Sequence, residues 1–370
     1  MLPSIHRPAY IEVDLAKLKH NLQSELSAVP EGTKVFAVVK ANAYGHGLVK
    51  VAKMELEYGA AGLCVATLDE GLELRNNGID APILVLGIVP VEYAKVAARA
   101  NISLTVGNLD WLKVAAELRV TNLRVHLGID SGMGRIGFQE KSDLIEACNF
   151  LNDHKDAFIP EGLFTHFATA DSPDEKYFEK QVKRFKEMQS DLPTKFTYVH
   201  CANSATALWH QELATNVIRD GIALYGLNPS GTDITKTPYK LEPALSFYSE
   251  LVFVKKVKAG ESIGYGATYT SDKDEWIGTI PVGYADGWLR RMQGSDVLIN
   301  GQRCQNVGRI CMDQFMVRLP GELPVGTKVT ILGKDGNDEI TATDAAEYSG
   351  TINYEILCSL SERLPRVYKN

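Results

Sequence analysis

The sequence predicts an α/β fold in which an N-terminal (β/α)8 barrel of the TIM type is followed by a C-terminal, mostly antiparallel β domain. Apolar runs alternate with amphipathic segments over the first part of the chain. After about Leu241 the apolar pattern approaches a period of two and glycine turns come closer together. Residues 228–239, rich in Pro, Thr, Ser and Gly, resemble a linker. The expected domains are therefore residues 1–240 and 241–370.

The first domain contains eight candidate strands, each followed by a connecting segment. The strands are residues 35–39, 62–66, 83–86, 102–106, 123–127, 161–165, 196–199 and 216–219, and the helices between them include 49–58, 68–76, 91–100, 109–118 and 175–189. Right-handed connections between eight parallel strands favour a closed barrel. An open doubly wound sheet is the alternative, and the absence of a GxGxxG motif after the first strand weakens it.

The second domain reads as a set of short strands separated by turns. The candidates are residues 249–256, 276–282, 297–299, 305–307, 314–318 and 328–332.

Bulk composition excludes several classes of protein. The net charge of −7 and the absence of a polybasic run argue against nucleic-acid binding. No apolar run is long enough to span a membrane, and the N-terminus lacks the apolar stretch of a signal peptide. The six cysteines form no CxxC pair, so neither a metal nor a redox site is expected. Their apolar neighbours suggest reduced, buried thiols in a cytoplasmic protein.

The most informative stretch is residues 35–47, where an apolar strand ends at Lys40 and a loop that contains Asn42, Gly45 and Gly47 follows. The C-terminal ends of barrel strands carry the chemistry of this fold. An amine among apolar neighbours has a lowered pKa and can form a Schiff base. The strand alone also allows a structural interpretation, in which Lys40 extends its amine into solvent.

Other strand ends in the barrel carry polar groups that would meet Lys40 at the same face. They are Arg135 in a glycine loop after the fifth strand, His166 after the sixth, Asn203 and Ser204 after the seventh, and Arg219, Gly221 and Ile222 after the eighth. Loops after the last two strands commonly bind phosphate through hydroxyl and backbone N–H groups. Each residue also has a plain structural interpretation: Asn203 or Ser204 as a helix cap, and His166 as a core histidine.

Residues 39–47 resemble the pyridoxal-phosphate lysine segment of the alanine racemases, and Arg219 has a specific chemical consequence if it faces the pyridine ring that this resemblance implies. Most pyridoxal-phosphate enzymes use a carboxylate to keep the ring nitrogen protonated. An arginine cannot accept that proton, so the ring would stay neutral and be a weaker electron sink. Such a ring suits racemisation better than transamination. The structural alternative is an ion pair of Arg219 with Asp220 or another carboxylate.

Two motifs in the second domain could contribute to the same site. Tyr265 lies between Gly264 and Gly266, which leaves its ring accessible for acid–base work, although a hairpin-turn tyrosine is the plain alternative. The segment 308–314 could present the backbone N–H of Met312 to a carboxylate.

Together these motifs resemble the alanine racemases. The segment 39–47 matches the pyridoxal-phosphate lysine segment of that family almost word for word, and the other motifs follow in the family's order, including residues 7–14 and 354–357. The resemblance covers essentially the whole chain. It implies a pyridoxal 5'-phosphate-dependent enzyme that interconverts L- and D-alanine and supplies D-alanine for peptidoglycan.

The resemblance also implies residue roles. Lys40 would hold the cofactor as an internal aldimine and act as the base for D-alanine, while Tyr265 from the partner subunit of a homodimer would be the base for L-alanine. His166 and Arg219 would link Tyr265 to the ring nitrogen, and Arg135 and the N–H of Met312 would bind the substrate carboxylate. The phosphate would contact Tyr44, Ser204, Gly221, Ile222 and Tyr354, with Asn203 beside it. The entrance would be lined by Asp171, Tyr284, Arg290, Arg309 and Ile352.

One position departs from the family pattern. Many members carry a carbamylated lysine at the end of the fifth strand, where it orients the substrate arginine, and this chain has Gly128 there. Carbamylation cannot occur at Gly128, so we expect another anion, chloride or a carboxylate, to face Arg135.

Other functions remain open on the sequence. A related pyridoxal-phosphate amino-acid decarboxylase, a racemase of broader specificity, a cofactor carrier and a Schiff-base aldolase without cofactor are the alternatives. Two bases on opposite faces, Lys40 and Tyr265, favour racemisation, and a carrier would need no second domain.

Overall fold

The computed structural model describes residues 3–213 and 215–370, which form two compact units. The barrel unit comprises Leu18–Ala43 and Leu48–Glu242. The C-terminal unit comprises Pro243–Asn370, the short segment Tyr44–Gly47 and the N-terminal segment that ends at Lys17. The sequence-based division had placed all of residues 1–240 in the barrel. The structure differs from it in the N-terminal segment and in the four residues from Tyr44.

The barrel unit is built on eight parallel strands. They are β2 (Lys34–Val38), β3 (Gly62–Val65), β4 (Ile83–Ile88), β5 (Ser103–Val106), β6 (Leu123–Gly128), β7 (Phe158–Phe164), β8 (Tyr198–His200) and β9 (Val217–Asp220). Their order in the sheet is β8-β7-β6-β5-β4-β3-β2-β9, which brings the first strand of the series next to the last. The expected eight strands and the barrel architecture are therefore confirmed, and the open doubly wound sheet is wrong.

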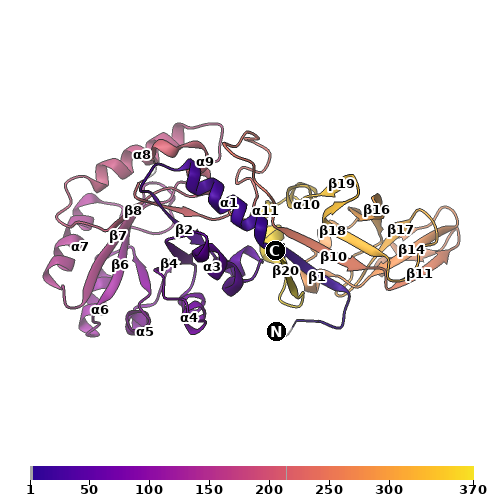
Figure 1. Ribbon diagram of the computed structural model, residues 1–370, viewed down its shortest axis with the longest axis horizontal. Coiled ribbons are helices and arrows are strands. Elements are labelled where there is room, and N and C mark those ends of the chain that lie inside the picture. Colours follow the sequence, from indigo (N-terminus) through magenta and orange to yellow (C-terminus); the bar gives the residue numbers. More distant parts are fainter. Residues whose placement is uncertain (1–2, 214) are drawn as a thin grey trace. The chain divides into compact units, whose positions relative to one another are not determined.

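Helices lie outside these strands (Figure 1). They are α1 (Leu15–Ala28), α3 (Leu48–Glu57), α4 (Leu68–Asn76), α5 (Ala94–Arg99), α6 (Leu109–Glu117), α7 (Lys141–Asp153), α8 (Lys176–Gln189) and α9 (Ser204–Trp209). Polar side chains cap the starts of α4, α6 and α9. Thr67 and Glu70 form a capping box on α4, and Asn108 accepts a hydrogen bond from the backbone of α6. Most strand side chains are buried on both faces, as expected for parallel strands covered by helices.

The barrel closes between β8 and β9 through side chains rather than through a strand ladder. The Asn216 amide accepts a hydrogen bond from Val199 N (2.8 Å) and donates one to Thr197 O (2.7 Å). Farther along, Arg219 N donates to Ala202 O (3.0 Å). The Asn216 side chain thus takes the place of a paired backbone residue at this seam, and it brings the ends of β8 and β9 together.

The C-terminal unit is a mostly antiparallel sheet, as expected. Its principal path runs β11-β14-β17-β16-β15-β18-β10-β1-β20. The strands are β10 (Leu245–Glu250), β11 (Phe253–Val257), β14 (Glu275–Ile280), β15 (Asp296–Ile299), β16 (Gln302–Val307), β17 (Phe315–Leu319), β18 (Lys328–Asp335) and β20 (Arg366–Lys369), with two helices, α10 (Ala342–Ser349) and α11 (Asn353–Ser359).

The N-terminal strand β1 (Ala9–Asp14) belongs to this sheet and not to the barrel. It pairs antiparallel with β10 and parallel with β20. Its side chains alternate between buried and half-buried, with Ala9, Ile11 and Val13 inside. That alternation is typical of a strand with one face in the core, whereas a barrel strand is apolar on both faces. The period of two was the sequence signal that separates this segment from the barrel.

The single strand expected over residues 249–256 is two strands. Between β10 and β11 the chain changes partners, because Leu251 pairs its backbone with Gly326 and Thr327 while Val252 N donates to Thr279 O (2.9 Å). The Leu251 side chain is fully buried at this bend. The sequence pattern over residues 249–256 therefore gave no sign that the chain leaves its partner β18 and pairs with β14.

The six cysteines are all free thiols. Cys64, Cys148, Cys201 and Cys304 are buried as expected, but Cys311 is half-buried and Cys358 is exposed. No helix in the described part of the chain is long and apolar enough to cross a membrane.

Candidate active site

A cavity of about 280 Å³ lies at the C-terminal ends of the barrel strands. Its lining brings together four residues expected in the site, namely Lys40, Arg135, His166 and Arg219. The other lining residues are Ala66, Leu86, Gly87, Ile129, Met133, Ile136 and Phe164. Three cationic side chains thus share one cavity whose lining contains no carboxylate. This composition favours an anionic ligand.

Lys40 stands immediately before an unusual turn of the backbone. Ala41, Asn42, Ala43 and Tyr44 all have φ between 50° and 55°, which makes one turn of left-handed helix from residues other than glycine. Each such residue costs about 1–2 kcal/mol relative to the right-handed conformation. Strain of this kind is kept where a fixed side-chain direction is needed for function. The sequence predicted a loop here but not its handedness.

Three hydrogen bonds hold the left-handed turn. Ala41 N donates to the Glu70 carboxylate (2.7 Å), Ala43 N donates to Val39 O (2.8 Å), and the Asn42 side chain accepts from Leu48 N (2.7 Å). Glu70 also forms the capping box of α4, so the direction of Lys40 is tied to a neighbouring helix. The turn is therefore held by the residue before Lys40, by the start of α3 and by the capping residue of α4.

Arg219 lies at the end of β9 and is buried. Its Nη1 is 2.5 Å from His200 Nδ1, and its Nη2 donates to Thr165 O (2.8 Å) and lies 3.3 Å from His166 Nδ1. Within the described residues, Arg219 makes no ion pair with a carboxylate. The ion-pair alternative raised from the sequence is therefore wrong, and burial lowers the pKa of this guanidinium.

The loops after β8 and β9 meet at Ser204. Its hydroxyl donates to Asp220 Oδ1 (2.6 Å) and accepts from Gly221 N (2.8 Å). Asn203 is the N-cap of α9, because its side chain accepts from Thr206 N (3.0 Å). The cap interpretation of Asn203 is thus confirmed. Gly221 and Ile222 follow directly at the end of β9, so the backbone N–H groups expected to bind phosphate come together with the start of α9.

The loop that carries Arg135 folds back on the end of β6. Asp130 accepts hydrogen bonds from Gly132 N (3.0 Å) and Gly134 N (2.9 Å). A Cβ on Gly137, whose φ is 121°, would come within 2.7 Å of Gly128 O, so this close approach requires glycine. The loop therefore places Arg135 over the strand end where Gly128 lies.

Gly128 leaves room for an aromatic ring. A Cβ at this position would be 3.3 Å from the ring of Phe164, which stacks on His200 at a centroid distance of 5.0 Å and an interplanar angle of 4°. The Arg219 guanidinium carbon lies 5.4 Å from the centre of the same ring. Phe164, which pairs with Gly128 across the two strands, thus packs against both His200 and Arg219.

His166 and Asp171 follow β7 in the same unit. Burial, together with the nearby charges of Arg219, Arg135 and Lys40, holds the pKa of His166 well below its usual range, so the ring is neutral. Burial raises the pKa of the half-buried Asp171. His166 lines the cavity, whereas Asp171 is not part of its lining.

The remaining expected site residues belong to the C-terminal unit. Tyr265 is 70 % exposed and lies between Gly264 and Gly266, whose φ values are both 74°. A Cβ on Gly266 would be 2.9 Å from Arg309 Nη1, so the Arg309 side chain lies against the residue that follows Tyr265. The plain interpretation as a hairpin-turn tyrosine is confirmed, because Tyr265 lies in the connection between β12 (Ser262–Ile263) and β13 (Tyr269–Thr270), which pair antiparallel.

A second pair of expected residues lies on two adjoining segments of this unit. Tyr284 N donates to Cys311 O (3.1 Å), and Ala285 N donates to Met312 O (3.0 Å). Tyr284 and Met312 are both largely exposed, and Arg290 begins a short 3-10 turn a few residues later. Both side chains are therefore accessible at the surface of this unit.

Tyr44 and Tyr354 also come together in the C-terminal unit, with ring centroids 6.1 Å apart. Tyr354 is the second residue of α11, and Ile352 is the N-cap of that helix with an exposed side chain. The structure thus places four expected residues in the lining of the barrel cavity and the others elsewhere in the barrel unit or in the C-terminal unit. Those in the barrel unit that do not line the cavity are Asp171, Asn203, Ser204, Gly221 and Ile222.

Sequence reasoning assigned no role to three residues that support the cavity. His126, Phe164 and His200 are buried inside the barrel near Arg219, and His126 is a fully buried polar residue in β6. A histidine at a core position of a parallel strand was the available signal, since a buried ring requires polar partners.

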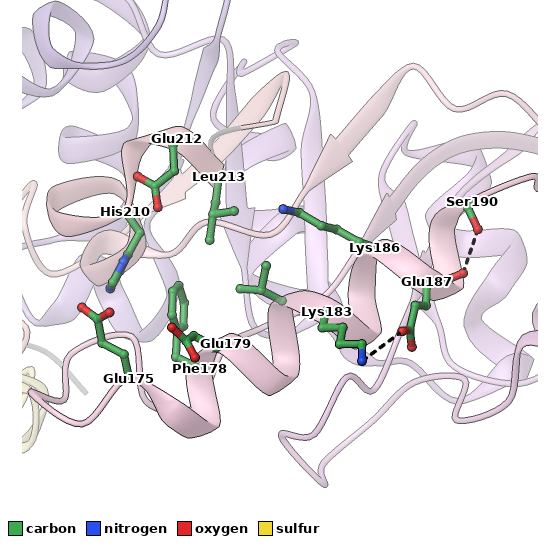
Figure 2. Close-up of a pocket in the computed structure, with 11 residues that line it drawn as sticks. Glu175, Phe178, Glu179, Lys183, Lys186, Glu187, Ser190, His210, Glu212 and Leu213 are labelled. Carbon is green, nitrogen blue, oxygen red and sulfur yellow. Dashed lines mark hydrogen bonds and ion pairs between the residues drawn. The ribbon is translucent and has the colours of Figure 1, made fainter.

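A second hollow of about 660 Å³ runs along α8 (Figure 2). Lys183 and Glu187 form an ion pair there (3.9 Å), and none of the expected site residues lines this hollow. In the described part of the chain, no group of three or more Asp, Glu, His or Cys side chains is arranged to hold a metal.

Comparison with known proteins agrees with this geometry. Residues 13–229 match the family described as alanine racemase, N-terminal domain, and residues 244–368 match alanine racemase, C-terminal domain. The chain belongs to the alanine racemase family. It is 54% identical to the alanine racemase of Ligilactobacillus salivarius over 98% of this chain and 99% of that protein.

Solved structures of alanine racemases have the same fold. The enzyme from E. faecalis is 50% identical with a TM-score of 0.97, and both chains are covered completely. The enzyme from Bacillus anthracis with bound L-Ala-P is 46% identical with a TM-score of 0.95, covering 98% of this chain and 95% of that one. A histidine racemase from Leuconostoc mesenteroides subsp. sake is also similar, at 35% identity and a TM-score of 0.94 over the full length of both chains. The expected fold and enzyme class are thus confirmed for this member of the alanine racemase family.

Proposed function

We propose that this enzyme interconverts L-alanine and D-alanine with pyridoxal 5'-phosphate and two bases, Lys40 and Tyr265, and supplies D-alanine for peptidoglycan. The observation that carries the proposal is the barrel cavity itself. A strand-end lysine shares it with Arg135, His166 and Arg219, and the cavity lining contains no carboxylate.

The residues of the cavity fit the cofactor. Its phosphate and the substrate carboxylate are anions, and the three cationic side chains of the lining favour both. When bound, the cofactor acidifies the Cα proton of an attached amino acid by delocalising its electrons. Lys40 would hold it covalently through Nζ, since a lysine amine forms a Schiff base with the cofactor aldehyde. The strained turn after Lys40 would keep that side chain directed at the cofactor.

Two proton carriers on opposite faces are what racemisation requires. Lys40 Nζ would remove or return the Cα proton on one face, as the base for D-alanine. The hydroxyl oxygen of Tyr265, contributed by the partner subunit, would do so on the other face, as the base for L-alanine.

Arg219 and His166 would orient the ring and Tyr265. Arg219 has only N–H donors, so a ring nitrogen that faces it accepts a hydrogen bond and stays unprotonated. His166 Nδ1 faces Arg219 Nη2, so in the neutral ring Nε2 carries the proton and can donate to the oxygen of Tyr265.

The other expected residues would bind the two ends of the ligand. Arg135 and the N–H of Met312 would hold the substrate carboxylate, with chloride or a carboxylate opposite Arg135 in place of the family's carbamylated lysine. Tyr44, Ser204, Gly221, Ile222 and Tyr354 would hold the phosphate beside Asn203. Asp171, Tyr284, Arg290, Arg309 and Ile352 would line the entrance and exclude larger amino acids.

The substrate is tested with a panel of L-amino acids and the cofactor-loaded protein. We expect alanine to lose its optical activity fastest, serine more slowly, and histidine least, although a histidine racemase shares the fold. Release of CO₂ from any amino acid is followed in parallel. Faster turnover of histidine than of alanine would show a racemase of other specificity, and CO₂ release would show a decarboxylase.

A homodimer with shared active sites accounts for the exposed residues of the C-terminal unit. Tyr265, Tyr284 and Met312 are all exposed there, which suits a surface covered by another subunit. A two-fold axis would place each C-terminal unit on the partner's barrel and create two equivalent sites.

Subunit mixing tests this arrangement. Lys40→Ala and Tyr265→Phe homodimers should each be nearly inactive. After mixing and refolding, about half of the dimers are mixed and each has one intact site, so roughly a quarter of wild-type activity should return. If both residues act within one chain, mixing restores nothing and the trans assignment of Tyr265 is wrong.

A further inference from the structure

A continuous series of buried side chains runs from Arg219 down the inside of the barrel. Arg219 Nη1 is 2.5 Å from His200 Nδ1, His200 Nε2 is 2.8 Å from His126 Nδ1, and His126 Nε2 is 3.1 Å from Glu161 Oε2. All four side chains are buried. They come from β9, β8, β6 and β7 in turn, and Glu161 lies three residues before the end of its strand. The series therefore links the cavity to the interior of the barrel below it.

The direction of each hydrogen bond in this series is determined by its first member. A guanidinium only donates, so His200 Nδ1 must accept from Arg219. The proton of neutral His200 is then on Nε2 and is donated to His126 Nδ1. The proton of neutral His126 is likewise on Nε2 and is donated to Glu161. A doubly protonated ring at either position would place two donors face to face, so both histidines are neutral.

The electrostatics of the two rings agree with this assignment. Burial lowers the pKa of His126, with the nearby Arg219 adding to the effect, and the hydrogen bond to Glu161 offsets it only in part. Burial and the charge of Arg219 hold the pKa of His200 well below its usual range. Both rings therefore stay uncharged at neutral pH.

Glu161 is the anionic end of the series. It accepts hydrogen bonds from the Ser103 hydroxyl and from His126 at Oε2, and from Arg124 Nη1 (2.9 Å) at Oε1. Burial alone would raise the pKa of this carboxyl, but the hydrogen bonds from His126 and Ser103 lower it overall, so Glu161 is ionised. The series of hydrogen bonds thus has the cationic Arg219 at its cavity end and the anionic Glu161 at its other end.

The packing leaves the two rings little freedom. A Cβ on Gly162 would lie 2.2 Å from His126 Nδ1, so glycine at this position makes the space for that ring. Phe164 stacks on His200, and Gly128 leaves the space for Phe164. Glycine at positions 162 and 128 is therefore part of how this chain packs the series.

We infer that Glu161 and His126 are positioning residues for Arg219, because they fix the tautomer of His200 and so hold the guanidinium as a donor at the cavity. Neither residue lines the cavity, and both act through His200. The expected effect of these residues on the rate of racemisation rests on the proposed function. The assignment of the histidine tautomers does not depend on it.

The tautomers are read by ¹⁵N NMR of the full-length protein labelled in the histidine rings, with signals assigned through His126→Gln and His200→Gln variants. Both rings should be neutral with the proton on Nε2 at neutral pH. Glu161→Ala removes the acceptor and should shift the His126 proton partly to Nδ1. Glu161→Gln retains an oxygen acceptor and should restore the wild-type pattern, and Arg124→Gln, which touches only Oε1, should leave the tautomers unchanged. A proton on Nδ1 of either ring in the wild-type protein would overturn the inference.

Kinetics with alanine supply the second reading. Glu161→Ala should lower kcat about tenfold and leave KM within about twofold, because Glu161 does not touch the substrate, and Glu161→Gln should recover most of the loss. An unchanged kcat in a folded Glu161→Ala protein, or equal losses in the Ala and Gln variants, would contradict the positioning role. A wild-type protein inactive toward alanine would instead contradict the proposed function, while the NMR spectra would still decide the tautomers.

Discussion

Replacing Lys40 by alanine is expected to lower racemisation by at least about 10³-fold, because the variant loses both the covalent attachment of the cofactor and one of the two bases. No second lysine lines the described cavity, so no other amine can take its place. Borohydride reduction followed by peptide mass spectrometry checks the assignment. The wild-type peptide that contains Lys40 should gain the mass of a pyridoxyl group, and the variant should show no modified peptide.

Lys34→Ala is the matched control, because Lys34 lies on the same strand β2 at its exposed N-terminal end. This variant should keep both its activity and the modified Lys40 peptide. A Lys40→Ala protein that still forms a reducible adduct and remains fully active would show that the lysine is misassigned.

Replacing Arg219 by glutamate should have the second largest effect. In the wild type the guanidinium faces three acceptors, His200 Nδ1, Thr165 O and His166 Nδ1. The variant removes these N–H donors and places a further acceptor, a carboxylate, among them. A carboxylate also stabilises a protonated ring nitrogen, which makes the cofactor a stronger electron sink. We expect racemisation to fall by roughly 10²–10⁴-fold, with pyruvate formed from alanine as transamination increases.

Arg219→Lys separates charge from geometry. It keeps a cation and N–H donors but loses the planar fork of the guanidinium. This variant should lose part of its racemase activity and form no more pyruvate than the wild type. Unchanged pyruvate formation in Arg219→Glu would count against a position of Arg219 at the ring nitrogen.

Much of the barrel could be predicted from the sequence because parallel strands that are buried on both faces have continuous apolar sequences. In such a barrel the C-terminal ends of all strands lie at one face, so Lys40 and the polar residues after the later strands were expected to meet there. The cavity does bring Lys40, Arg135, His166 and Arg219 together. Once eight strands are counted, the topology of the fold determines which strand ends meet.

Other features depend on energies that no local pattern expresses. Four left-handed residues after Lys40 contradict the ordinary preference of alanine, and they are held by Glu70 from another helix. The series from Arg219 to Glu161 joins residues from four strands, so its partners become visible only when the barrel is closed. For β1 the alternating pattern was a local signal of a strand with one buried face, but its partners β10 and β20 lie far away in the sequence, so the sheet it joins is decided by the tertiary fold.

The most direct measurement is circular dichroism of alanine solutions incubated with the purified, cofactor-loaded protein. Starting from L-alanine, the signal should decay to zero, and starting from D-alanine, a signal of opposite sign should decay to zero as well, since both enantiomers reach the same racemic mixture. A signal that persists from either enantiomer while the protein retains its bound cofactor would contradict the proposed racemisation of alanine.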